Sequence, residues 1–446
     1  MKFTVIFQIF KERLSGADGA MLLFFGFLGL VIFGLILWRF GTGVLMAIPI
    51  ILVGLQITKS NTLNGLVLAI RFFLISLLPF YVAFSRKNQI RFSPTAGVLL
   101  LLPITMLLNS VRAYNVADAV GQSILFMLMY ISLVLGGQKI LGDERGRAIF
   151  TRTLILFSIV MACIQIPSLG SARGRLEGVF ENVVGFMTVG MFGVIILFWF
   201  MMKQRFGGIL FLFFGGFTGL TLVLLILTAG RTALGGAALG IAVILSRKLR
   251  RNAAIFLVIS ILFAPVILKT AASFPGFEAV KSKLFSERSS GRGVLWQHAW
   301  EQIKQKPVFG WGTQYAFITS VATTGLEYHN SFLEFACDHG IPFAIVMLFL
   351  FLWYPFRGLY LMRHSPTEEL KDMANLSSAF LAALVFSSFL GGGLLATTGT
   401  LLIYTAIGLQ EGIHAECKKV QDELANEYLY DNQDVDNEQL SEQYQT

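Results

Sequence analysis

Charged residues are scarce in this chain of 446 residues. Asp, Glu, Lys and Arg make up 14% of it and hydrophobic residues make up 55%, whereas soluble domains average about 25% charged residues. This scarcity excludes a soluble enzyme with a single apolar tail. Apolar runs of about 20 residues, long enough to cross a bilayer core, recur along almost the whole length. Because the runs are continuous rather than alternating, a β-barrel is excluded, and the sequence predicts an all-α, polytopic membrane protein.

Cysteine is also rare. Cys163, Cys337 and Cys417 fall in different segments without metal-ligand spacing, so neither a disulfide framework nor a zinc site is expected. The net charge of +9 arises from basic residues in short loops, which are the usual orientation signal of membrane proteins. No basic patch with interleaved aromatic residues points to a nucleic-acid partner.

The apolar runs define the expected spans. They cover residues 20–38, 42–58, 64–84, 95–109, 119–141, 149–167, 183–202, 208–228, 232–246, 252–270, 340–357, 374–390 and 395–410. Two crossings before Leu63 would place Lys2, Lys11 and Arg13 outside. Either one of these two runs does not cross, which gives about twelve crossings with both ends of the chain in the cytoplasm, or the positive-inside rule is broken there.

Basic residues mark every second loop. By the positive-inside rule these loops are cytoplasmic and the others are external. The cytoplasmic loops contain Arg86-Lys87 with Arg91, Arg145 with Arg147, Lys203 with Arg205, Arg247-Lys248 with Arg250-Arg251, and the stretch from Arg357 to Lys371. We therefore expect an N-terminal transmembrane bundle over 1–270, a partly helical external loop over 271–339, transmembrane helices over 340–410 and an acidic, disordered cytoplasmic tail over 411–446.

The external loop contains a predicted amphipathic helix at 294–306. Val294, Trp296, Trp300 and Ile303 recur near a helical period. Pro307 should end this helix, and a turn should follow at Gly310-Trp311-Gly312. Tryptophans suit a helix that lies on the membrane surface.

Several arginines fall on the external side, where their planar donor fork suits a diphosphate. Arg231 lies at the junction of two apolar runs, where an unpaired charge is costly and marks a functional site by default; the alternative is a side chain that snorkels from a helix end. Arg292 precedes the amphipathic helix, whose free amides attract anions. Arg175 fits a surface ion pair as well as a substrate contact, and Arg71, inside an apolar run, is either a buried ion-pair partner or part of the site. Arg173 and Arg288 complete the external set.

Of five histidines, His329 is the best candidate for a general base. His364 and His414 fall on the cytoplasmic side, His298 is expected to be solvated on the amphipathic helix, and His339 is expected to be structural at a helix start. His329 faces the external arginines, and imidazole suits proton transfer near neutral pH. The neighbouring Asn330 either orients the ring or the acceptor, or caps the next helix.

The order and spacing of these residues resemble the bacterial O-antigen ligase and O-antigen polymerase family of polytopic glycosyltransferases. One departure is the stretch 177–182, which reads Glu-Gly-Val-Phe-Glu-Asn where the family has a small polar residue and a Gly-Asn-Pro-Asn-like turn, so the family supports Arg175 and Asn182 less than the rest. The resemblance rests on Gly174-Arg175-Leu176 with Asn182, Gly230-Arg231-Thr232, Arg292 with Trp296, Pro307 with Phe309-Gly310-Trp311-Gly312, and His329-Asn330-Ser331-Phe332-Leu333-Glu334 with Gly340-Ile341.

The resemblance implies a metal-independent glycosyltransferase in the bacterial inner membrane, without a cofactor, whose site faces the periplasm. The donor would be a glycan on undecaprenyl diphosphate, held by Arg231, Arg292, Arg175, Arg288 and Asn330, with His329 as the base. A ligase would use lipid A–core or another glycan as the acceptor, and a polymerase a second lipid-linked repeat unit. A transporter of lipid-linked sugar would call for internal repeats, and a membrane scaffold explains neither Arg231 nor His329.

Overall fold

The computed structural model describes residues 43–56, 75, 79, 93–169, 183–228, 230–248, 292–324, 328–390 and 397–443. Throughout these ranges the regular structure is helical and no strand occurs, which confirms the all-α class. The α-helices are α3 (Gly43–Gln56), α5 (Pro94–Leu99), α6 (Leu101–Asn109), α7 (Val116–Met129), α8 (Gly136–Leu141), α9 (Glu144–Gln165), α10 (Val183–Met201), α11 (Ile209–Leu227), α12 (Arg231–Lys248), α15 (Arg292–Gln305), α16 (Tyr315–Thr324), α17 (Ser331–His339), α18 (Ile341–His364), α19 (Glu368–Leu390) and α20 (Thr397–Gln443).

Six helical segments of the described chain are long and apolar enough to span a membrane. Each coincides with an expected run, which makes this a multi-pass membrane protein. They cover Pro94–Arg112, Val116–Leu141, Glu144–Gln165, Ile209–Leu227, Ile341–His364 and Glu368–Phe389. The expected spans 20–38 and 252–270 lie outside the described residues, as does nearly all of 64–84, and the count of about twelve crossings stays a prediction.

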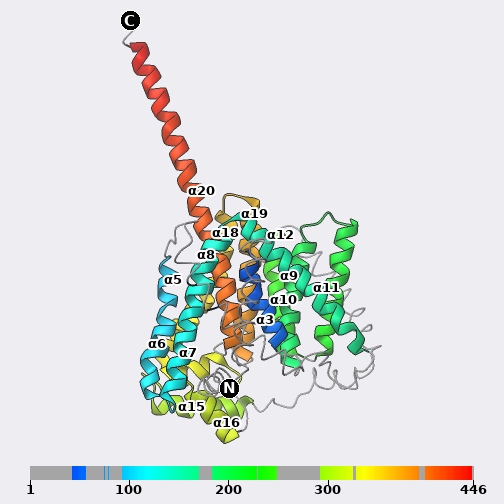
Figure 1. Ribbon diagram of the computed structural model, residues 1–446, viewed down its shortest axis with the longest axis vertical. Helices are drawn as coiled ribbons and strands as arrows, with labels where there is room; N and C mark the ends of the chain where they lie inside the picture. The colour runs from blue at the N-terminus through cyan, green and yellow to red at the C-terminus, as the bar shows by residue number, and fades with distance from the viewer. Residues whose placement is uncertain are drawn as a thin grey trace, which may run out of the picture.

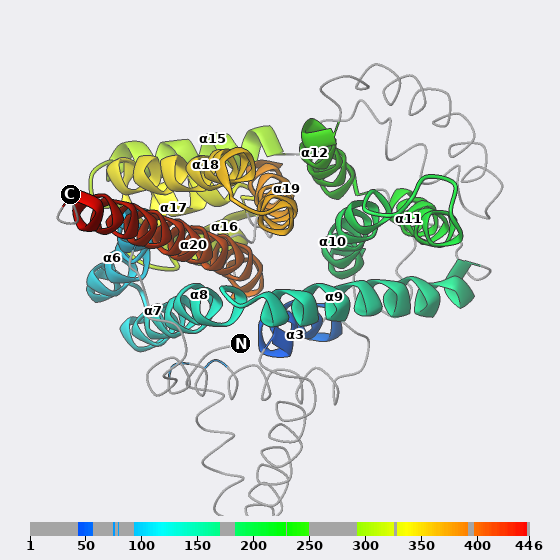
Figure 2. The same cartoon turned by 90° about the horizontal axis from the view of Figure 1, so that it is seen from above.

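Small residues bring the central helices close together. Figures 1 and 2 show α12 beside α10 and α19, and α19 also packs against α18 and α20. A Cβ atom at Gly235 of α12 would lie 2.4 Å from the Phe386 ring, and one at Gly240 would lie 2.6 Å from the Ile195 side chain. The glycines of α12 therefore permit the close helix contacts that are typical of membrane bundles.

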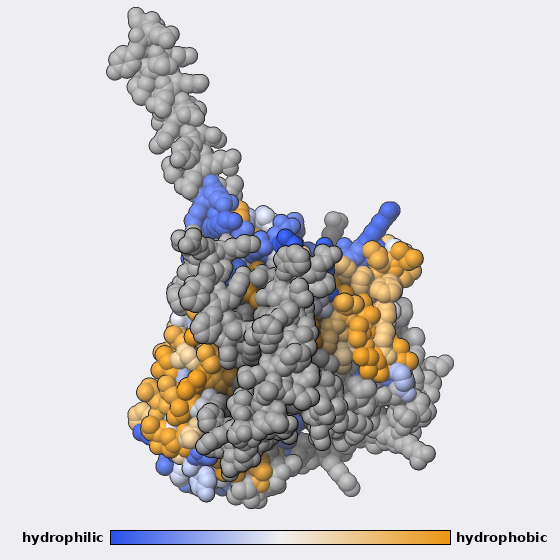
Figure 3. Space-filling model, in the orientation of Figure 1, coloured by the Kyte–Doolittle hydropathy of each residue, from blue (hydrophilic) through white to orange (hydrophobic). Residues whose placement is uncertain are grey.

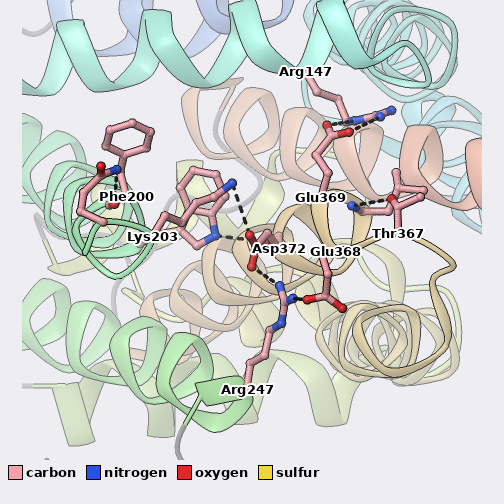
Figure 4. A network of polar contacts seen from close by, with 11 residues as sticks. Arg147, Phe200, Lys203, Arg247, Thr367, Glu368, Glu369 and Asp372 are labelled. Carbon is pink, nitrogen blue, oxygen red and sulfur yellow. Dashed lines mark hydrogen bonds and ion pairs between the residues drawn. The ribbon is translucent and has the colours of Figure 1, made fainter. Parts of the chain in front are cut away.

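One end of the bundle is tied by ion pairs (Figure 4). Glu369, at the start of α19, receives two hydrogen bonds from Arg147 of α9, at 2.9 and 3.1 Å. Asp372 pairs with Arg247 at the end of α12 and with Lys203, 3.3 Å away, just after α10. These contacts bring residues from three of the predicted basic loops, Arg147, Lys203 and Arg247, to one end. Arg357 is different, because it lies within α18 and not in the loop that follows.

The opposite end carries three short helices, α15, α16 and α17, which form the described part of the expected external loop. Figure 1 shows α15 and α16 at the end of the bundle remote from the α18–α19 connection. In the space-filling view, hydrophobic residues gather on the flanks of the bundle and hydrophilic ones at the end where α20 emerges (Figure 3). This distribution suits a bundle whose flanks face lipid.

The structure differs from the expectation of a disordered tail from residue 411. α20 continues as one helix to Gln443 and projects beyond the bundle (Figure 1). Its Glu411 is 1% exposed, accepts a hydrogen bond from Ser93 at 3.0 Å and pairs with Arg357. A buried carboxylate is tolerable when a cation and further donors surround it. The acidic average composition of the segment conceals this pairing, since the partners come from distant parts of the chain.

Candidate active site

Helix α15 positions much of the candidate site. It begins at Arg292 and ends at Gln305, just before Pro307, close to the predicted bounds. Its packed face consists of Leu295, Ala299 and Ile303, one helical row that meets α16 and α17. Of the predicted apolar residues, Val294 is 71% exposed and Trp300 49%, and their contact with the membrane surface stays a prediction.

The turn after α15 is hydrogen-bonded to the junction between α17 and α18. The backbone amide of Trp311 donates to the Cys337 carbonyl at 2.9 Å, and that of Ile341 donates to the Pro307 carbonyl at 2.7 Å. Gly340 has a φ of +91°, and a Cβ atom there would lie 2.1 Å from the Val308 carbonyl oxygen. Only glycine fits such an approach. The glycine motifs of this region are thus required by chain packing.

Asp338 is a site residue that the sequence interpretation missed. Its buried carboxylate accepts hydrogen bonds from the amides of Gln314, at 2.9 Å, and Ala316, at 2.7 Å, and thereby fixes the start of α16. Burial raises the pKa of Asp338 to about 7, although the backbone hydrogen bonds act in the opposite direction. The available signal was an acid beside Cys337 and His339 at the end of a short helix, just before an apolar run.

His339 is structural, as predicted. It is 1% exposed, its Nδ1 accepts a hydrogen bond from Asn109 Nδ2 at 3.0 Å, and its ring lies 4.4 Å from that of Phe335. Burial lowers the pKa of His339 to about 3, so the ring stays neutral. The contact joins α6 to α17 beneath the external helices.

His329 lies between two anchored residues at the start of α17. Its φ is +54°, a left-handed conformation that is uncommon for a residue other than glycine and is found at functional sites. On one side, Asn330 caps α17, because its Oδ1 accepts from the amides of Phe332 and Leu333 at 3.0 and 3.1 Å. The capping role considered for Asn330 is confirmed; a role in substrate binding stays a prediction.

On the other side, Tyr328 is fully buried and held by α15. Its carbonyl accepts a hydrogen bond from Trp296 Nε1 at 3.0 Å, and its hydroxyl lies 2.9 Å from His298 Nδ1. The expectation that His298 is solvated is therefore wrong. His298 is half-buried on α15 and contacts the residue that precedes His329.

Arg231 and Arg292, distant in sequence, come together at this end. Arg231 is the first residue of α12 and is exposed; Arg292 is the first residue of α15 and is half-buried. The pKa of Arg292 is lowered by burial and, secondly, by the positive charge of Arg231. Neither guanidinium forms an ion pair with any other described residue. Two unneutralised cations at two helix N-termini form a site suited to an anion.

The other predicted donor contacts, Arg175 and Arg288, lie outside the described residues, as do Arg71, Arg173 and Asn182. In the ranges that are described, no three His, Cys, Asp or Glu side chains are grouped as metal ligands.

A family model described as O-antigen ligase matches residues 216–349. The match includes Arg231, Arg292 and His329 and runs from within α11 into α18, so it contains the whole described external site. No curated protein matches the chain. The segment 216–349 is therefore similar to the O-antigen ligase family, and the resemblance found in the sequence is confirmed.

Proposed function

We propose that this protein moves a glycan from undecaprenyl diphosphate to a sugar hydroxyl of a glycolipid acceptor such as lipid A–core. The reaction takes place at the outer face of the bacterial inner membrane. The observation that carries the proposal is the proximity of Arg231 and Arg292, at the external end that also holds His329, within the segment that matches O-antigen ligases.

The paired arginines suit the diphosphate of the carrier. Without an anion the two positive charges repel each other, and the partial burial of Arg292 increases that cost. A bound diphosphate removes the repulsion and offers each guanidinium a two-point hydrogen bond. It also meets the amides of the first turns of α12 and α15. Arg288 and Arg175 complete the proposed donor site.

The proposed reaction is a direct displacement. The acceptor hydroxyl oxygen attacks the anomeric carbon as the bond from that carbon to the diphosphate oxygen breaks, and the electron pair of that bond leaves with undecaprenyl diphosphate. His329 takes the hydroxyl proton. The arginines stabilise the charge that develops on the leaving group, so the step needs no metal ion and inverts the anomeric configuration.

The orientation follows from charge. The end tied by Arg147, Lys203 and Arg247 is cytoplasmic under the positive-inside rule. The external helices and His329 then face the periplasm, where lipid-linked glycans are displayed for transfer.

Deletion of the gene tests the proposal. The surface glycans of the deletion strain, separated on a gel, should lose the capped acceptor while polymer accumulates on the lipid carrier. Retention of a single capped repeat without longer chains would instead favour a polymerase. Surface glycans and carrier-bound glycans identical to those of the parent strain would overturn both.

A further inference from the structure

Helix α15 links the arginine site to His329. Arg292 is its first residue, and Trp296 and His298 follow within the next two turns. Trp296 and His298 both contact Tyr328, one at its carbonyl and the other at its hydroxyl. One short helix therefore carries both a donor contact and the anchor of the residue before the proposed base.

We propose that His298 is a positioning residue, which acts through the Tyr328 hydroxyl to hold His329 in the conformation that accepts the proton. This inference rests on the proposed function and adds a residue to it. His298 itself does not contact the substrate.

The local geometry explains why His329 needs such support. Its left-handed backbone is disfavoured, and such a conformation persists only where the surroundings impose it. The helix cap made by Asn330 fixes the following residue. The preceding residue, Tyr328, is fixed by its burial in one cluster with Leu295, Ala299 and Cys337 and by its two hydrogen bonds to α15.

The hydrogen bond between His298 and Tyr328 can be removed by substitutions that leave the surrounding packing in place. The Tyr328 ring is fully buried, so Tyr328→Phe removes the hydroxyl and leaves the packed ring in place. His298 is half-buried, so His298→Leu removes the hydrogen-bonding ring without emptying a core position. His298→Gln retains a hydrogen-bonding group. Trp300→Phe, on the exposed side of the same helix, is the control.

The experiment uses the full-length protein in nanodiscs, with lipid-linked glycan and acceptor membranes from cells that lack the protein. Small misplacements of catalytic groups cost up to about a hundredfold in rate, so His298→Leu and Tyr328→Phe should each lower kcat by about tenfold or more. Their double variant should be no worse than either single variant, because both remove one interaction. KM and the binding of undecaprenyl diphosphate should change less than twofold, and His298→Gln should recover most of the rate.

Unchanged kcat in both single variants, or losses that multiply in the double variant, would overturn the inference. So would a loss of undecaprenyl diphosphate binding that parallels the loss of rate. Failure of the proposed function looks different, since the unchanged protein would then transfer no glycan from the lipid-linked donor to the acceptor. Full transfer by His329→Ala would exclude His329 as the base. If His329→Ala is inactive while His298→Leu and Tyr328→Phe are normal, only the positioning role fails.

Discussion

At the scale of single residues, the proposal gives Arg231 and Arg292 a different chemical role from His329. Arg231 and Arg292 bear unneutralised charge at helix starts, whereas His329 is held in a strained backbone at the start of α17. Binding of the donor and removal of the proton should therefore fail independently when these side chains are changed.

Arg231→Ala should weaken donor binding. Charge-assisted hydrogen bonds contribute about 1.5–3 kcal/mol, so the dissociation constant for undecaprenyl diphosphate should rise about ten- to a hundredfold. The dissociation constant of Arg231→Lys should lie between those of the unchanged protein and Arg231→Ala, because lysine keeps the charge and loses the planar fork. Binding of undecaprenyl diphosphate to each variant in nanodiscs measures both dissociation constants. Arg112→Ala is the matched control, since Arg112 lies over the Phe309 ring; equal binding by Arg231→Ala and Arg112→Ala would contradict the assignment.

His329→Ala should lose turnover and keep donor binding. General-base catalysis contributes about 10²–10⁴-fold, and the arginines that hold the donor are untouched. Initial transfer rates and undecaprenyl diphosphate binding, measured on the same preparation, separate the two effects. His364→Ala, at the end of α18 remote from the site, should leave both values unchanged. Normal turnover by His329→Ala would rule out the base.

At the scale of elements, Asp338 controls how firmly α16 is held to α17. Its pKa in the folded protein is about 7, above the ordinary value of about 3.9. The folded state therefore binds the proton more tightly than the open state does. The resulting stability is fully present below about pH 4 and is lost as the pH rises through about 7.

The start of α16 should therefore open more readily at pH 8 than at pH 5. Hydrogen exchange at the amides of Gln314 and Ala316, which donate to Asp338, should show weaker protection at the higher pH after correction for intrinsic exchange. Asp338→Asn cannot ionise and should show a flat profile. An equally steep profile in Asp338→Asn would assign the effect to another group.

At the scale of the whole molecule, the ion pairs near the start of α19 and the short helices α15 and α16 lie at opposite ends of the bundle (Figure 1). Single cysteines at the exposed positions Gln297, on α15, and His364, at the end of α18, should test the orientation in a background without the three native cysteines. A membrane-impermeant thiol reagent should label position 297 in intact cells and position 364 only after lysis. Matching labels at the two positions would contradict the orientation and the external site.

Sequence alone predicted most elements of the membrane bundle. All six described spans were expected, because the length of an apolar run sets where a helix can cross a bilayer. The start of α15 near Arg292, its end before Pro307 and the structural role of His339 followed from local patterns too. These features depend on residues that are close along the chain.

Tertiary structure decided which distant residues meet. The proximity of Arg231 and Arg292, the hydrogen bond between His298 and Tyr328 and the pairing of Glu411 with Arg357 each connect distant parts of the chain. Periodicity and composition describe one segment at a time and contain no information about its partner. For this reason His298 was expected to be solvated, Asp338 was overlooked and the tail was expected to be disordered at Glu411, although all three residues are held by contacts that only the packed bundle provides.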